Sequence, residues 1–264
     1  KNHAFEQIPI NSKSKDEIAN MTKTYNNLMD ELEQSYVRQQ QFVGNASHEL
    51  KTPLTVIESY TDLLLRRGFE QKDVAQEALE AISSESKTMK ELIEQMLSLA
   101  KSTESMKMNF TELNVIDFLN EIAAQMNVAF ETKVEVVGEN VAIVTDKQKL
   151  HQILYILIDN ARKYSELVSP ITISTKVHGE SVTISVTDRG IGIPADDLPH
   201  IFDRFYRVKK DRSRKTGGTG LGLSIATQLA ELIQGKLSAE STVGVGTTIH
   251  LRLPLSLEVI SDEN

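Results

Sequence analysis

The chain has 264 residues, of which 40% are hydrophobic and 25% charged, so it is long enough for one or two ordinary globular domains. Its formal net charge of −8 argues against nucleic acid as a partner, because that binding needs clustered positive charge. The absence of Cys excludes disulfides, thiolate catalysis and Cys-based zinc sites. No apolar run is long enough to span a bilayer. Because the chain begins at Lys1 without Met, we expect it to be part of a longer protein, in which there is room for a membrane segment upstream.

The first predicted helix covers residues 15–36. Its apolar residues are spaced alternately three and four apart, as the a and d positions of a coiled coil are: Ile18, Met21, Tyr25, Leu28 and Leu32. A stripe this narrow buries little apolar surface in a lone helix. We therefore expect a partner helix from a second copy of the chain.

Two longer helices are predicted over about 37–67 and 73–101, each with one apolar face. Gly68 is placed to end the first of them, and a short polar stretch over 70–72 separates the two. Two antiparallel helices joined by a short turn form a hairpin. Two such hairpins can form a four-helix bundle.

The polar stretch over 102–108 is predicted to be a domain boundary, beyond which helices and strands mix. Asn114 is placed to cap the first helix after it, and residues 190–220 are expected to be rich in loops. We expect helices at 114–126, 147–164 and 221–233, and strands at 134–137, 141–145, 171–177, 182–187, 236–239 and 247–253. This arrangement predicts an α+β sandwich, with the helices on one face of a mixed sheet.

One candidate for chemistry is the segment Phe42–Thr55, which reads FVGNASHELKTPLT. His48 and Thr52 are four residues apart and share a helix face, and a neutral imidazole nitrogen is a nucleophile near pH 7. Glu49 is placed to accept the other ring N–H. Pro53 cannot donate to a carbonyl four residues back, so we expect a kink there. A lone His beside a Glu is more often just a solvated surface pair.

This segment resembles the phosphoacceptor box of sensor histidine kinases, in which His-Glu-x-x-Thr/Asn-Pro recurs. Four further segments are similar to the asparagine, first glycine, phenylalanine and second glycine boxes of that family, and they follow in the family's order: 152–165, 188–194, 201–207 and 217–223. A lesser glycine box follows at 244–248. The resemblance covers residues 42–253. Residues 5–36 also resemble the end of a HAMP signalling module, the linker that follows a transmembrane helix.

The asparagine box implies part of an ATP site. Asn160 would ligate Mg²⁺ through its amide oxygen, a neutral hard ligand suited to an ion that keeps several waters and bridges phosphates. Lys163 would reach a phosphate as a mobile point charge, and Tyr164 would flank the adenine. One position departs from the family. Ile156 stands where the family has an Asn and related ATPases have a water-activating Glu, so poor hydrolysis and weaker Mg²⁺ binding are expected.

The glycine boxes imply the rest of the ATP site. Asp188 would accept from the exocyclic amine of adenine, while Gly190 and Gly192 let the backbone turn tightly against the base. Phe205 and Arg207 match the phenylalanine box, and the basic residues after them suit a lid over polyphosphate. A glycine-rich run then opens a helix, where free N–H groups bind anions. Its predicted phosphate-binding residues are Gly218, Thr219, Gly220, Leu221 and Gly222.

The resemblance implies a kinase that transfers the γ-phosphoryl group of Mg-ATP to His48 and then passes it to an Asp of a response regulator receiver domain. Glu49 would hold the imidazole ring, and Thr52 would position water to dephosphorylate the regulator. Two other readings stay open: an ATP-hydrolysing relative of the same nucleotide fold, and a coiled-coil adaptor whose ATP domain has degenerated.

Three domains are expected: a HAMP-like coiled-coil linker over 1–36, a dimerisation and phosphotransfer hairpin over 37–104, and a catalytic ATP-binding domain over 105–264. The expected fold class is α+β, a dimeric four-helix bundle followed by an α/β sandwich of the type found in histidine kinases and Hsp90-like ATPases. The expected partners are a second copy of the chain and a response regulator. The resemblance places the chain at the cytoplasmic face of the cell membrane, anchored only through segments upstream.

Overall fold

A computed structural model describes residue 8 and residues 17–67, 71–100, 108–130, 132–165, 169–208 and 218–256. The predicted helix-ending Gly68, most of the predicted boundary at 102–108 and the basic residues after Arg207 lie outside these ranges. The chain divides into two compact units, 1–89 and 90–264. Within the described ranges, no helix is long and apolar enough to cross a membrane.

The first unit begins with α1 (Glu17–Arg67), which is one continuous helix of 51 residues. The prediction of two helices that meet near residue 36 is therefore wrong. The apolar stripe changes its position there, but nothing interrupts the backbone hydrogen bonds. Pro53 lies inside α1 and does not end it, although its missing N–H leaves the Glu49 carbonyl without its usual helical donor.

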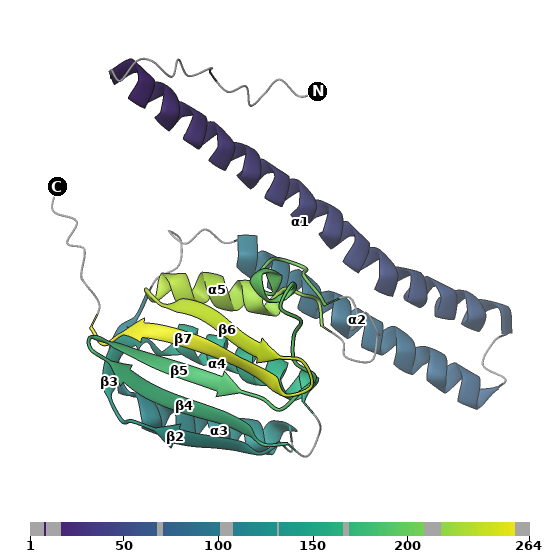
Figure 1. Cartoon of the computed structure of the whole chain (residues 1–264). Helices are drawn as coiled ribbons and strands as arrows, with labels where there is room; N and C mark the ends of the chain where they lie inside the picture. Colours follow the sequence, from purple (N-terminus) through teal and green to yellow (C-terminus); the bar gives the residue numbers. More distant parts are fainter. Residues whose placement is uncertain are drawn as a thin grey trace. The chain divides into compact units, whose positions relative to one another are not determined.

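The second helix, α2 (Lys72–Ala100), returns in the opposite direction, which confirms the predicted hairpin (Figure 1). Its first part belongs to the first unit and its last turns to the second. The predicted coiled-coil seam of α1 is largely exposed, with Ile18 at 70%, Met21 at 73% and Leu28 at 56%. The seam is thus apolar surface that the hairpin itself does not cover.

The second unit is built on a five-stranded sheet in the order β2-β4-β5-β7-β6. β2 pairs with β4 in parallel, and all other neighbours are antiparallel, so the sheet is mixed as predicted. Its strands are β2 (Val134–Gly138), β4 (Ile171–His178), β5 (Ser181–Thr187), β6 (Lys236–Thr242) and β7 (Gly246–Pro254).

Three helices cover one face of this sheet (Figure 1): α3 (Val115–Phe130), α4 (Lys147–Tyr164) and α5 (Gly222–Leu232). The Asn114 side chain caps α3 by accepting from the Asp117 N–H at 3.1 Å, as predicted. Asp146 caps α4 by accepting from the N–H groups of Gln148 and Lys149. Both caps fix where a helix begins relative to the sheet.

A separate two-stranded sheet pairs β1 (Phe110–Asn114) with β3 (Ala142–Asp146). β1 is absent from the sequence prediction, and its first three residues are exposed. The core lies between the main sheet and the helices. Its largest fully buried side chains are Leu119, Ile122, Ile143, Leu150, Ile153, Leu154, Leu157, Ile158, Ile171, Ile173, Ile184 and Leu221.

Candidate active site

Asp188 follows the end of β5 and is 9% exposed. Its Oδ1 accepts from the N–H of Gly190 at 2.8 Å and from the N–H of Thr247 at 3.2 Å. Burial raises the pKa of this carboxyl group above its ordinary value, and the two N–H donors partly offset that rise. Because both donors bind the same oxygen, the other oxygen is available to an outside donor such as the amine of a purine.

The loop after Asp188 has no room for side chains at its glycines. A Cβ on Gly190 would lie 2.1 Å from the carbonyl oxygen of Tyr164, at the end of α4. Gly192 has a φ of +67°, and its Cβ would lie 2.1 Å from the carbonyl oxygen of Thr242, at the end of β6. The loop therefore passes closely between α4 and the β6–β7 turn.

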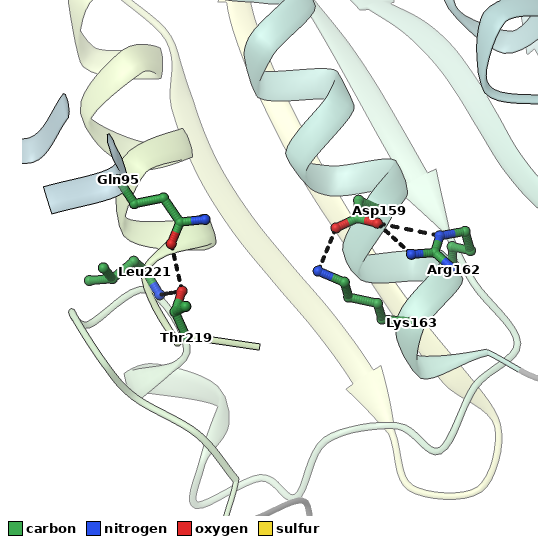
Figure 2. Close-up of polar contacts among 6 residues, drawn as sticks. All are labelled: Gln95, Asp159, Arg162, Lys163, Thr219 and Leu221. Carbon is green, nitrogen blue, oxygen red and sulfur yellow. Dashed lines mark hydrogen bonds and ion pairs between the residues drawn. The ribbon is translucent and has the colours of Figure 1, made fainter. Parts of the chain in front are cut away.

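The C-terminal end of α4 carries an ionic cluster (Figure 2). Asp159 binds Lys163 Nζ at 2.7 Å through Oδ2 and Arg162 Nη2 at 2.9 Å through Oδ1. The Arg162 guanidinium lies 4.6 Å from the ring centre of Phe130, which fixes its plane. Lys163, predicted to bind phosphate, thus has an anionic partner on its own helix.

The start of α5 faces the end of α4. A Cβ on Gly222 would lie 3.4 Å from Ile156 Cγ2 and 3.9 Å from Asn160 Nδ2, and a Cβ on Gly218 would lie 3.4 Å from the Tyr164 hydroxyl. The asparagine box and the second glycine box therefore line one region. Ile156 also faces this region and presents an apolar side chain to it.

Phe205 reaches the same region through the backbone. Its N–H donates to the Gly220 carbonyl at 2.9 Å, and its φ of +62° is rare for a residue with a side chain. Gly220 has a φ of +72°, and a Cβ there would lie 2.7 Å from the Phe205 carbonyl carbon. Arg207 is half-buried two residues on. The phenylalanine box is thus held directly against the second glycine box.

A hydrogen-bonded chain links α2 to the glycine-rich loop (Figure 2). The Thr219 hydroxyl donates to Gln95 Oε1 at 2.7 Å and accepts from the Leu221 N–H at 3.3 Å. Leu221 directly precedes α5, where N–H groups without helical partners favour anions. Gln95 belongs to the same compact unit as this loop.

His48 lies in the first unit, on an exposed turn of α1. Thr52 donates to the His48 carbonyl at 3.3 Å, which confirms that both stand on one helix face. Glu49 is exposed next to it. In the described part of the chain, the Glu49 carboxylate and the imidazole form no hydrogen bond with each other.

Sequence reasoning did not identify Asp159, Thr247 or Gln95 as neighbours of the site. Thr247 reaches Asp188 from 59 residues along the chain, and Gln95 reaches Thr219 from 124 residues away. The lesser glycine box at 244–248 was the available signal for Thr247. For Asp159, the signal was the spacing of four residues from Lys163, which allows an ion pair on one helix face.

Two segments of the chain match known domain families. Residues 38–105 match the His Kinase A (phospho-acceptor) domain, and residues 145–257 match the histidine kinase-, DNA gyrase B-, and HSP90-like ATPases. The first match contains His48. The second contains the region lined by Asn160, Asp188 and the start of α5, which we call the nucleotide cradle. The predicted fold class, a helical hairpin followed by an α/β ATP-binding domain, is thereby confirmed.

Two bacterial proteins are similar over most of the chain. Sensor histidine kinase YkoH of Bacillus subtilis is 41% identical over 250 residues, covering 94% of this chain and 55% of that protein. Signal transduction histidine-protein kinase ArlS of Staphylococcus aureus is 35% identical over 242 residues, covering 89% and 53%. The chain thus spans about half the length of these relatives.

Solved structures agree in fold. Histidine kinase AdeS of Acinetobacter baumannii has a TM-score of 0.59 at 20% identity, covering 79% of this chain and 98% of that one. Histidine kinase ThkA, solved in complex with response regulator protein TrrA, has a TM-score of 0.68 at 18% identity, covering 85% and 66%. With a phosphoacceptor domain and a kinase-type ATPase domain in the expected order, the chain belongs to the sensor histidine kinases.

Proposed function

We propose that the protein transfers the γ-phosphoryl group of ATP to His48. The observation that carries this proposal is the pairing of an exposed histidine on a long helix with a separate nucleotide cradle. In that cradle, Asp188 offers a carboxylate oxygen to a purine amine and the start of α5 offers N–H groups to phosphates. ATP has chemical groups that match both.

In the transfer step, a ring nitrogen of His48 attacks the γ-phosphorus while the bond to the β,γ-bridging oxygen breaks and ADP leaves. Glu49 accepts the proton of the other ring nitrogen and so neutralises the positive charge that the attack creates on the imidazole. The N–H groups at the start of α5 and Lys163 hold the phosphates in line. Positioning and charge neutralisation supply most of the rate.

Asn160 suits a magnesium ion bound mainly through the nucleotide. Its half-buried amide lies near the start of α5, and an amide oxygen is a neutral hard ligand of the kind that Mg²⁺ accepts. No group of three His, Asp or Glu side chains able to hold a metal occurs in the described ranges. Asn160 is therefore proposed to supply the protein ligand, with the remaining positions filled by phosphate oxygens and water. Bound there, Mg²⁺ would neutralise phosphate charge.

Ile156 favours phosphoryl transfer over hydrolysis. Its side chain faces the start of α5 from α4, and its place in the asparagine box is that of the water-activating Glu of related ATPases. An alkyl group cannot take a proton from water. Steady phosphate release without labelled protein would instead favour the hydrolysing alternative, and failure to bind ATP with Mg²⁺ in calorimetry would favour the degenerate adaptor.

The proposed partners follow from the hairpin. A second copy of the chain would cover the exposed seam of α1 and complete a four-helix bundle. A response regulator receiver domain would take the phosphoryl group from His48, as the complex of ThkA with a response regulator suggests by analogy. We further propose the domain bounds 1–36, 37–104 and 105–264, and anchoring at the cytoplasmic face of the membrane through upstream segments.

Thr52 is proposed to serve a second activity, dephosphorylation of the regulator. Its hydroxyl is exposed on the same face as His48 and is engaged only by a 3.3 Å bond to the His48 carbonyl. A bond this long is weak, so the hydroxyl can turn outward and position a water against a phosphoaspartate.

The proposed function is tested by incubating the full chain with γ-labelled ATP and Mg²⁺ and mapping the labelled peptide. We expect one acid-labile phosphate on the peptide that contains His48, none in His48→Gln, and unchanged labelling in Thr52→Ala, the matched variant from the same helix face. Label that persists in His48→Gln would show that the phosphoacceptor is another residue.

A further inference from the structure

The last turns of α2, which belong to the second unit, carry buried side chains on one face. Leu92 and Leu99 on this face are 2% and 6% exposed, and Gln95 lies between them at helical spacing. Gln95 is half-buried, and its carboxamide oxygen accepts the Thr219 hydroxyl proton at 2.7 Å (Figure 2). A polar side chain held between two buried leucines is well placed to make one directed contact.

The proton of the Thr219 hydroxyl can serve only one acceptor at a time. A hydroxyl has one proton to donate and two lone pairs to accept with. In the structure the proton goes to Gln95, and a lone pair accepts from the Leu221 N–H. A phosphate oxygen at the start of α5 is an acceptor only, so it can bind this hydroxyl only by taking the proton away from Gln95.

We infer that Gln95 is a positioning residue that competes with nucleotide phosphate for the Thr219 hydroxyl and so lowers affinity for ATP. This inference rests on the proposed function and on the prediction that Thr219 binds the phosphates of ATP. The bond from the Leu221 N–H persists in both states, because it uses a lone pair and not the proton. Only the contact with α2 is exchanged.

The competition links the nucleotide to the helix of the phosphoacceptor hairpin. By thermodynamic reciprocity, if the Gln95 contact weakens phosphate binding by some factor, phosphate weakens the Gln95 contact by the same factor. The site for ATP and the last turns of α2 therefore sense each other through one hydroxyl group.

The test measures affinity by calorimetry for a non-hydrolysable ATP analogue with Mg²⁺ and for adenosine, which lacks phosphates. A net hydrogen bond contributes about 1 kcal/mol, so Gln95→Met is expected to bind the ATP analogue about fivefold more tightly. Adenosine affinity should stay unchanged. Methionine keeps the length and apolar stem of glutamine, so the packing between Leu92 and Leu99 is retained.

Three further variants isolate the hydroxyl. Thr219→Val lacks the hydroxyl proton, so adding Gln95→Met to it should not change the affinity for the ATP analogue. Thr219→Ser keeps the proton, so adding Gln95→Met to it should raise that affinity as it does in the wild type. Gln76→Met, on an exposed turn of the same helix, is the control and should match the wild type. Equal affinity gains in the presence and absence of the Thr219 hydroxyl would indicate a general packing effect and overturn the inference.

The outcomes also separate this inference from the proposed function. If the wild type binds the ATP analogue and Gln95→Met binds it equally or less tightly, only the role of Gln95 is wrong. If the wild type binds neither ligand, the nucleotide site itself is wrong, and the role of Gln95 falls with it.

Discussion

At the scale of single residues, Asp188 shows how a binding site conflicts with stability. The carboxylate is buried, and the two N–H donors to Oδ1 do not fully compensate for lost water, so its pKa is raised in the folded state. A raised pKa means that the folded protein binds this proton more tightly than the unfolded chain. The contribution of Asp188 to stability therefore falls as pH rises through the window between the ordinary and the raised pKa, and is constant above it.

Replacing Asp188 by Asn should accordingly separate affinity from stability. The amide oxygen of Asn keeps the bonds from Gly190 and Thr247, but its NH₂ group then faces the adenine amine, donor against donor. Affinity for the ATP analogue should fall on the order of tenfold to a hundredfold, as expected for losing a charge-assisted bond. The unfolding midpoint at pH 7 should not fall. Calorimetry measures the affinity and thermal unfolding measures the midpoint. Asp196→Asn, at an exposed position, is the control.

At the scale of an element, the end of α4 pairs its two cations with Asp159. Lys163 and Asp159 are 30% and 19% exposed, so their ion pair is partly shielded from water. Phosphate must compete with Asp159 for Lys163 and must also approach a fixed negative charge. Both effects weaken the binding of polyphosphate, and both depend on the same carboxylate.

Asp159→Asn should therefore increase affinity for the ATP analogue, on the order of fivefold for a partly exposed pair. Lys163→Met should abolish most of that gain when the two are combined, because the released cation is then absent. Glu121→Gln removes the comparable ion pair with Lys147 at the other end of α4 and is the control. Weaker binding in Asp159→Asn would mean that Asp159 orients Lys163 toward the phosphates and does not compete with them.

The elements also show which parts of the fold can be predicted from sequence. The bounds of α4 match the prediction because its apolar period is strong and Asp146 caps it. α1 was divided in two because its apolar stripe shifts, yet a helix ends only where its hydrogen bonds are interrupted. β1 was missed because it is short, pairs only with β3, and begins with three exposed residues that show no alternation.

The residues of the candidate site also fall into those that the sequence predicts and those that it does not. Residues inside a contiguous motif, such as Asp188 and Gly222, could be identified from their local pattern. Their partners could not, since Thr247 and Gln95 arrive through the sheet and through α2 from remote parts of the chain. The lesser glycine box marks Thr247, but no local spacing tells that it meets Asp188, because tertiary packing decides which side chains meet.

At the scale of the whole molecule, the seam of α1 is exposed apolar surface that a second copy of the chain is proposed to cover. Its exposed apolar residues recur at a and d spacing over several turns: Ile18, Met21, Tyr25, Leu28 and Leu32. The opposite face has a different role. Asn26 there is buried and binds the N–H and the carbonyl of Ile8, each at 2.8 Å, so Ile8 already occupies that side. A second copy is therefore expected to pack on the seam.

The double variant Leu28→Ser/Leu32→Ser should weaken this association without unfolding the second unit, in which neither residue lies. Full burial of a leucine contributes about 1.5–3 kcal/mol, and Leu28 and Leu32 are 56% and 52% exposed in the single chain, so each gains about half of that in a dimer. Because each change occurs in both copies, the dimer dissociation constant should rise by at least about a hundredfold. Sedimentation equilibrium measures this dissociation constant. Glu31→Ser/Glu33→Ser, in the same turns but off the seam, is the matched control. Equal dissociation constants for the two double variants would mean that the copies associate through another surface.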